Sequence, residues 1–146
     1  MFLHLAGFTL WLGGAAAAMA VGIAMRKEAG EGLGAAARMQ GAIYRSLVGP
    51  GALLTVFSGL ILTLQLYGTM FSTGGLPHAL MMMQAAGLLG ALVTLLVTVP
   101  TAAKVLRVDP VDDAPVFNAL RGRVRRSGMA GSLLALLALV GGALLR

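Results

Sequence analysis

Apolar residues gather in four long runs along the chain, separated by shorter polar segments. The first run covers residues 2–25 without a charged side chain, and the others cover about residues 47–67, 76–99 and 129–145. About 20 helical residues cross the roughly 30 Å hydrocarbon core of a bilayer. Because backbone amides in lipid need internal partners, each run is expected to be a helix. The pattern predicts an all-α polytopic membrane protein, a single domain over residues 1–146 built as a four-transmembrane-helix bundle.

Composition supports the same class of protein. Hydrophobic residues make up 58% of the chain and charged residues 11%, whereas soluble domains carry about 25% charged residues. Cysteine is absent, which excludes disulfides and thiolate metal centres. The net charge of +6 comes from basic residues beside the apolar runs. We therefore expect anionic lipid headgroups as partners, and no nucleic acid.

The basic residues also predict an orientation. Ten of the eleven Lys and Arg lie in two connections: Arg26, Lys27, Arg38 and Arg45 in the first, and Lys104, Arg107, Arg121, Arg123, Arg125 and Arg126 in the second. The positive-inside rule makes the connections at about 26–46 and 100–128 cytoplasmic and places both termini outside, in a bacterial inner membrane. Positive charge follows the first run instead of preceding it, so this run is expected to be retained and not cleaved as a signal peptide.

The second connection carries helix signals of its own. Asp113 can act as an N-cap, with Pro115 in the first turn. An apolar stripe follows, opposite Arg121, Arg123 and Arg125; it consists of Val116, Phe117, Leu120 and Val124. We expect either a short interfacial helix with its arginines at headgroup level or a solvated loop.

Small residues recur at helical spacing within three of the runs. They are Gly14, Ala18 and Gly22 in the first, Gly51, Thr55, Gly59 and Thr63 in the second, and Ala86, Gly87, Gly90, Ala91 and Thr94 in the third. Helices in lipid associate through close backbone contact at small residues. These stripes are therefore expected to be packing surfaces.

Few residues inside the runs can carry chemistry. None of the runs contains Asp, Glu, Lys or Arg, which disfavours a proton pump or an ion-coupled transporter. No catalytic acid, base or nucleophile can be identified in the membrane, so we do not expect an enzyme. The remaining candidates are His4, Trp11, Gln65, His78, Gln84 and the methionines 81–83.

Two histidines are the candidate ligands. His4 and Trp11 are seven residues apart and share a helix face, and His78 begins the third run, so both imidazoles are expected near the outer surface. Two imidazoles can hold a haem iron, and with the Met82 thioether they suit Cu(I). Each of these residues also has a structural interpretation. Each histidine can be a polar residue at the membrane interface, and Trp11 can pack against small residues of a neighbouring helix. The methionines can fill gaps between the helices. Gln84 is expected to hydrogen-bond to another helix.

The spacing H-x6-W-x-x-G, formed by His4, Trp11 and Gly14, resembles the first helix of small bacterial membrane proteins of the HemJ type. The second run, opening "VGPGALLTVFSGLIL", and a histidine before the third extend this likeness to the CopD copper-resistance domain and related four-helix families. The HemJ resemblance implies haem-dependent oxidation of protoporphyrinogen, with a first-helix histidine and a third-helix lysine as essential residues. His4 and His78 match the family's histidines, but Leu80 stands where the lysine would be. A haem or porphyrin site without that oxidase chemistry is compatible with the resemblance.

Three functions follow as expectations. The first is a protein that binds b-type haem or porphyrin through His4 and His78, with Trp11 beside them. The second is an accessory or assembly subunit whose partners are other membrane-protein subunits. The third is copper handling by His4, His78 and Met82; the likeness to CopD implies metal handling at the outer face by the two histidines, and the Met82 thioether is added because sulfur suits Cu(I).

Overall fold

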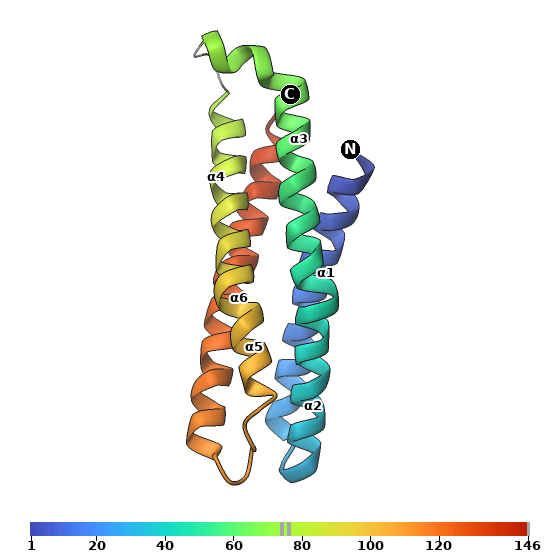
Figure 1. Ribbon diagram of the computed structural model, residues 1–146, viewed down its shortest axis with the longest axis vertical. Coiled ribbons are helices and arrows are strands. Elements are labelled where there is room, and N and C mark those ends of the chain that lie inside the picture. The colour runs from blue at the N-terminus through green and yellow to red at the C-terminus, as the bar shows by residue number, and fades with distance from the viewer. Residues whose placement is uncertain (74, 76, 146) are drawn as a thin grey trace.

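The computed structural model describes residues 1–73, 75 and 77–145, and for residues 71–73 the backbone alone. Its described part contains four helical rods long and apolar enough to cross a membrane, which lie side by side (Figure 1). The rods are formed as follows: α1 (Phe2–Ala24) with a 3₁₀ turn (Met25–Lys27); α2 (Gly30–Ile43), a π-helical turn (Tyr44–Val48) and α3 (Gly49–Thr73); α4 (His78–Val93), a second π-helical turn (Thr94–Thr98) and α5 (Val99–Val105); and α6 (Ala114–Ala143).

The rods are arranged as two antiparallel pairs. α1 packs along α3, and α4 packs along α6. Both chain ends lie at the same end of the bundle as the α3–α4 connection (Figure 1). We call this the terminal end and the opposite one the basic end. The predicted bundle of four apolar helices is thus present, whereas the side of a membrane that each end faces remains a prediction.

The helices extend well beyond the apolar runs. The connections expected at 26–46 and 100–128 are largely helical, because α2 continues into α3 and α6 already begins at Ala114. Asp113 is the N-cap residue and Pro115 lies in the first turn, as predicted, although the Asp113 side chain forms no capping hydrogen bond. The expectation of a separate short helix was wrong, since α6 continues unbroken to Ala143. Charged side chains leave the backbone hydrogen bonds intact, so polarity alone does not end a helix.

The apolar stripe predicted on this segment is only partly buried. Phe117 and Val124 are buried and Leu120 is half-buried, but Val116 is exposed. Arg121 does not lie opposite the stripe: its guanidinium carbon is 5.6 Å from the centre of the Phe117 ring. Residues four apart are neighbours on a helix, which brings Arg121 over Phe117.

Two irregular turns distort the central rods. Each π-helical turn ends two residues before a proline, Pro50 in the second rod and Pro100 in the third. A proline inside a helix lacks an N–H, and its ring clashes with the carbonyl four residues earlier. A π-helical turn before the proline relieves this clash. A Cβ atom on Gly49 would lie 3.7 Å from Cγ2 of Val99. The two irregular segments therefore lie side by side.

Small residues and Trp11 form the helix contacts, as predicted. The closest approach joins α1 and α3, where a Cβ on Gly51 would lie 2.5 Å from the Trp11 backbone nitrogen. The Trp11 side chain is 1% exposed. Its ring reaches α4, where Cη2 is 3.3 Å from a Cβ built on Gly90. The Trp11 side chain therefore contacts both the α1–α3 pair and the α4–α6 pair.

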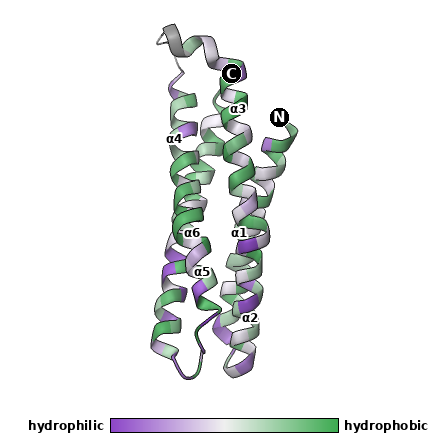
Figure 2. Ribbon diagram, in the orientation of Figure 1, coloured by the Kyte–Doolittle hydropathy of each residue, from purple (hydrophilic) through white to green (hydrophobic). Residues whose placement is uncertain are grey.

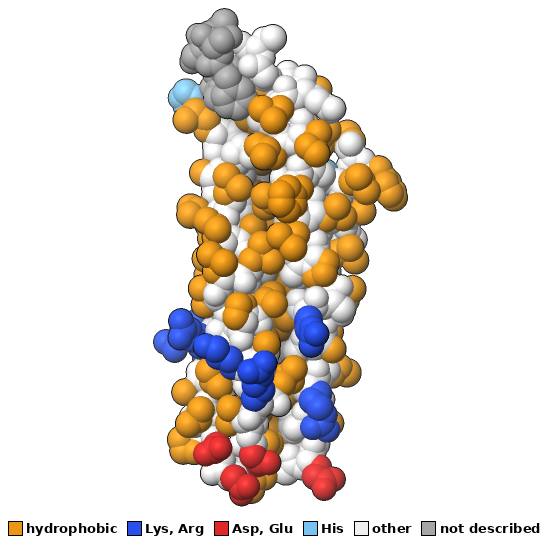
Figure 3. Space-filling view, viewed as in Figure 1, with side chains coloured by type: hydrophobic (Ala, Val, Ile, Leu, Met, Phe, Trp, Pro, Cys, Tyr) orange, Lys and Arg blue, Asp and Glu red, His pale blue; other side chains and the backbone are white. Residues whose placement is uncertain are grey.

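Polarity divides the molecule along its length. Hydrophobic residues dominate the terminal end and the middle, and hydrophilic residues increase toward the basic end (Figure 2). On the face shown in Figure 3, Lys and Arg side chains form a belt across the bundle, and Asp and Glu lie beyond it at the extremity. We call this zone the basic belt; its position between apolar and acidic surfaces fits the headgroup layer of a membrane.

Candidate functional site at His4

His4 lies in the first turn of α1 and is half-buried against α3. Its Nδ1 atom is 3.0 Å from the carbonyl oxygen of Thr55 and 3.3 Å from Oγ of Ser58. The close crossing of the two helices makes this contact possible, because a Cβ on Gly7 would lie only 2.8 Å from the Thr55 backbone nitrogen. A bulkier residue at Gly7 would push the first turn of α1 away from α3.

The hydrogen bonds of His4 define which ring nitrogen carries the proton. A backbone carbonyl can only accept, so Nδ1–H donates to Thr55. The Ser58 hydroxyl donates to the Leu54 carbonyl and can accept from the same N–H. Nε2 therefore keeps a free lone pair. Among the described residues Nε2 has no hydrogen-bond partner, and it is not fully buried.

Gly59 makes room for the imidazole ring. A Cβ on this residue would lie 2.9 Å from Cε1 and 3.2 Å from Nδ1 of His4. These separations are shorter than van der Waals contact allows, so even an alanine side chain would force the ring to move. Three residues of α3 thus fix the position of the His4 ring: Thr55, Ser58 and Gly59.

His78 lies apart from the residues that hold the His4 ring. It is the first residue of α4, directly after Pro77, and is exposed. Among the described residues no hydrogen bond joins His78 to His4 or to its partners Thr55 and Ser58. Within the described part of the chain, no three His, Cys, Asp or Glu residues come together as a metal site.

Other candidates take structural positions. Trp11 is buried between the helix pairs, and its ring packs edge-to-face on Phe8 with 6.3 Å between the ring centres. Leu80 is 2% exposed. Met81 and Met82 are both exposed one turn after His78. The amide of Gln84 donates a hydrogen bond to the Thr63 hydroxyl on α3, which confirms the predicted bond to another helix.

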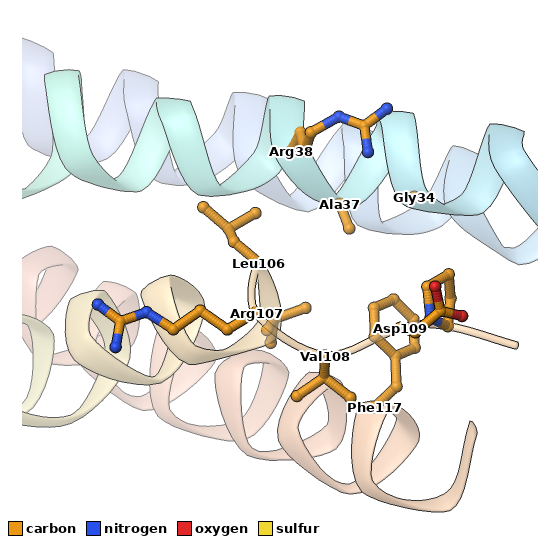
Figure 4. Close-up of a pocket in the computed structure, with 10 residues that line it drawn as sticks. Gly34, Ala37, Arg38, Leu106, Arg107, Val108, Asp109 and Phe117 are labelled. Atoms are coloured by element: carbon orange, nitrogen blue, oxygen red, sulfur yellow. The ribbon is translucent and has the colours of Figure 1, made fainter. Parts of the chain in front are cut away.

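A cavity of about 300 Å³ lies at the basic end, between α2 and the segment joining α5 to α6. Ala37 and Phe117 face each other across it, whereas the side chains of Arg38 and Arg107 extend away from it (Figure 4). The guanidinium groups of its two arginines therefore do not converge on a ligand. We assign it no binding role.

Comparisons of the chain with family models, curated proteins and solved structures found no significant match. The site therefore rests on the geometry of this chain alone. Sequence reasoning identified His4 but missed its contacts with Thr55, Ser58 and Gly59. Thr55 and Gly59 belong to a small-residue stripe that is visible in the sequence, whereas the rotation that turns this stripe toward His4 is not.

Proposed function

We propose that this chain is a small multi-pass membrane protein that binds b-type haem or another iron porphyrin at its terminal end, with Nε2 of His4 as the ligand to iron. The observation that carries this proposal is the hydrogen bond from Nδ1 of His4 to the Thr55 carbonyl. Metal-binding histidines commonly donate their second N–H to a carbonyl, which fixes the ring and leaves the other nitrogen to the metal.

The surroundings of His4 suit an apolar macrocycle. Phe2, Leu3 and Leu5 are exposed around it on the first turn of α1, where they can cover a flat hydrophobic ring. The chain lacks cysteine, so any haem would be held without thioether bonds. An iron porphyrin would bring ligand-binding or electron-transfer chemistry, and Nε2 of His4 would hold its iron. His78 would lie at the rim of this site instead of opposite His4.

The absorbance spectrum of protein purified in mild detergent and reconstituted with haem tests this proposal. We expect a Soret band that disappears in His4→Ala and persists in His78→Ala, which is the matched control. A protein that stays colourless with added haem would exclude the proposal. Loss of the band in both variants would instead support ligation by two histidines.

A role as an accessory or assembly subunit is the second candidate. An open groove of about 510 Å³ runs between α1 and α2, and small side chains line most of it. Its lining residues are Ala20, Val21, Ala24, Glu28, Gly32, Ala35, Ala36 and Met39. A helix of another membrane protein could approach closely there. The mass of the gently solubilised complex tests this role, and a lone monomer without a co-purifying protein would argue against it.

Copper handling is the third candidate. His78, Met81 and Met82 are exposed at positions i, i+3 and i+4 of α4, so they share one helix face. Imidazole and thioether groups suit Cu(I). We expect bound copper in elemental analysis if this role holds, and unchanged copper in the His78→Ala, Met82→Leu double variant would reject it.

A further inference from the structure

Hydroxyl groups from three rods gather where the two π-helical turns lie side by side. Tyr44 and Thr94 are the first residues of these turns, and Thr98 is the last residue of the second. The Thr98 hydroxyl donates a hydrogen bond of 3.0 Å to the Ser127 hydroxyl on α6. Ser127 donates in turn to the carbonyl of Arg123 at 2.9 Å. Polar side chains are thus concentrated in one part of an otherwise apolar bundle.

Two glycines of α6 make room for two of these hydroxyls. A Cβ on Gly128 would lie 2.8 Å from the Tyr44 hydroxyl oxygen and 3.7 Å from Cγ2 of Thr98. A Cβ on Gly131 would lie 2.7 Å from Oγ1 of Thr94. Residues three apart are neighbours on a helix surface. The Tyr44 and Thr94 hydroxyls therefore lie against neighbouring positions of α6.

Tyr44 and Thr94 differ from the other two hydroxyl residues in their hydrogen bonds. Thr98 and Ser127 are bonded to each other, whereas the side chains of Tyr44 and Thr94 have no hydrogen-bond partner within the part of the chain that the structure describes. Both are deeply buried, since Tyr44 is 5% and Thr94 3% exposed. Burying a hydroxyl without a partner is unfavourable. The two groups therefore call for a ligand that can both donate and accept hydrogen bonds.

The surroundings of the two hydroxyls suit water as that ligand. Neither oxygen is a fully buried atom, so a water molecule can reach each of them. Buried water usually forms about three hydrogen bonds to polar groups that lack other partners. Further acceptors lie in the same turns, because Pro50 and Pro100 offer no N–H to the carbonyls four residues earlier, those of Ser46 and Leu96.

We propose that the hydroxyls of Tyr44 and Thr94 bind ordered water inside the bundle, beside the two π-helical turns. Such water would link the second and third rods to α6 through hydrogen bonds. The site is independent of the haem proposal. Thr94 lies one turn beyond Gly90 toward the basic end, whereas His4 lies two turns from Trp11 toward the terminal end, and Trp11 and Gly90 are in contact.

X-ray radiolysis of the protein in detergent micelles tests the site. The beam splits water into hydroxyl radicals, which oxidise a side chain beside a bound water molecule before they diffuse away. We expect oxidation of the Tyr44 ring at a rate well above that of Trp11 and Phe117. These two residues are the matched controls, because they are aromatic, carry no hydroxyl and are each 1% exposed. In Tyr44→Phe we expect the ring at position 44 to lose this labelling, because the water has lost its partner.

Unfolding in mixed micelles gives a second readout. A hydrated hydroxyl exchanges one hydrogen bond for another on folding, whereas a dry one loses its partner. We therefore expect Tyr44→Phe and Thr94→Val to leave the stability unchanged or to lower it. Tyr67→Phe makes the same exchange at the half-buried tyrosine of α3, and we expect it to leave the labelling of Tyr44 unchanged.

Two results would overturn the proposal. Higher stability in Tyr44→Phe or Thr94→Val, or labelling of Tyr44 no faster than that of Phe117, would show a dry hydroxyl. Labelling of Trp11 and Phe117 as fast as that of Tyr44 would show that solvent enters the whole bundle, without a specific site at the two turns. Both substitutions remove one polar group and nearly preserve the shape of the side chain, so the variants are expected to fold.

Discussion

Nδ1 of His4 lies 3.0 Å from the carbonyl oxygen of Thr55, 51 residues away in the chain. This bond joins the first turn of α1 to the second turn of α3 and leaves Nε2 without a hydrogen-bond partner among the described residues. A histidine that served only as an interfacial polar residue would not need its ring fixed by a neighbouring helix. The relationship therefore makes His4 the first position at which a ligand should be sought.

Gly59→Ala is expected to weaken haem binding without unfolding the protein. The new Cβ would lie 2.9 Å from Cε1 of His4, so the ring must rotate away from Thr55. Changes to the hydrogen-bond partner of a metal-binding histidine typically cost 10–100-fold in affinity, and we expect a loss of that order in a haem titration. Gly68→Ala on the same helix is the control, because nothing lies within 4 Å of its Cβ position. Equal haem affinities in Gly59→Ala and Gly68→Ala would show that Gly59 does not help to fix the His4 ring.

Gly51→Ala is expected to destabilise the α1–α3 pair. Its Cβ would lie 2.5 Å from the Trp11 nitrogen and 2.9 Å from the Gly7 carbonyl oxygen, and backbone atoms cannot yield as side chains do. Overpacking of this kind costs about 1–3 kcal/mol. Unfolding in mixed micelles, followed by the fluorescence of Trp11, measures the loss directly, since Trp11 is the single tryptophan of the chain.

Gly13→Ala serves as the control for that measurement. Gly13 lies on the same helix as Trp11, and no atom lies within 4 Å of its Cβ position. We expect unchanged or slightly higher stability, because alanine favours a helix more than glycine does. Similar destabilisation by both variants would mean that the close crossing is not what holds α1 to α3.

The hydrogen bond from Gln84 to Thr63 is expected to couple α4 to α3. A double-mutant cycle with Gln84→Leu and Thr63→Val isolates this interaction from the packing of each side chain. Hydrogen bonds between transmembrane helices contribute about 0.6 kcal/mol on average and up to about 1.7 kcal/mol. We expect a coupling free energy in this range. A value of zero would show that the two side chains act independently.

The loop before α6 is expected to loosen in acid. The Val111 and Asp112 amides donate to Oδ1 of Asp109 at 2.7 and 3.0 Å, and these bonds hold the pKa of the Asp109 carboxyl below its usual value. A lowered pKa in the folded protein means that the bonds stabilise the turn above about pH 4, the ordinary aspartate value, and that this stability is lost as the pH falls through the lowered pKa.

Amide exchange of Val111 and Asp112 measures this effect. We expect protection near neutral pH that decreases at acidic pH in the wild type and is absent at all pH values in Asp109→Ala. Asp112→Asn is the control, because the Asp112 carboxylate accepts no hydrogen bond within the described residues. A pH response that survives in Asp109→Ala would assign it to another group.

The predicted orientation can be tested with single cysteines, because the natural chain has none. Gly75 and Asp112 are both exposed and lie at opposite ends of the bundle. We expect a membrane-impermeant maleimide to label Gly75→Cys in intact cells, and Asp112→Cys only after permeabilisation. The reverse pattern would invert the predicted orientation.

The sequence by itself determined that the chain forms four long apolar helices. Apolar runs free of charge specify rods that can cross a bilayer, and residues such as Gly51 were recognisable as packing positions because small residues recur four apart. Only the tertiary structure decided how each rod is rotated. In a lipid-facing protein both the buried and the exposed helix faces are apolar, so hydrophobic periodicity does not reveal which residue of α3 meets His4.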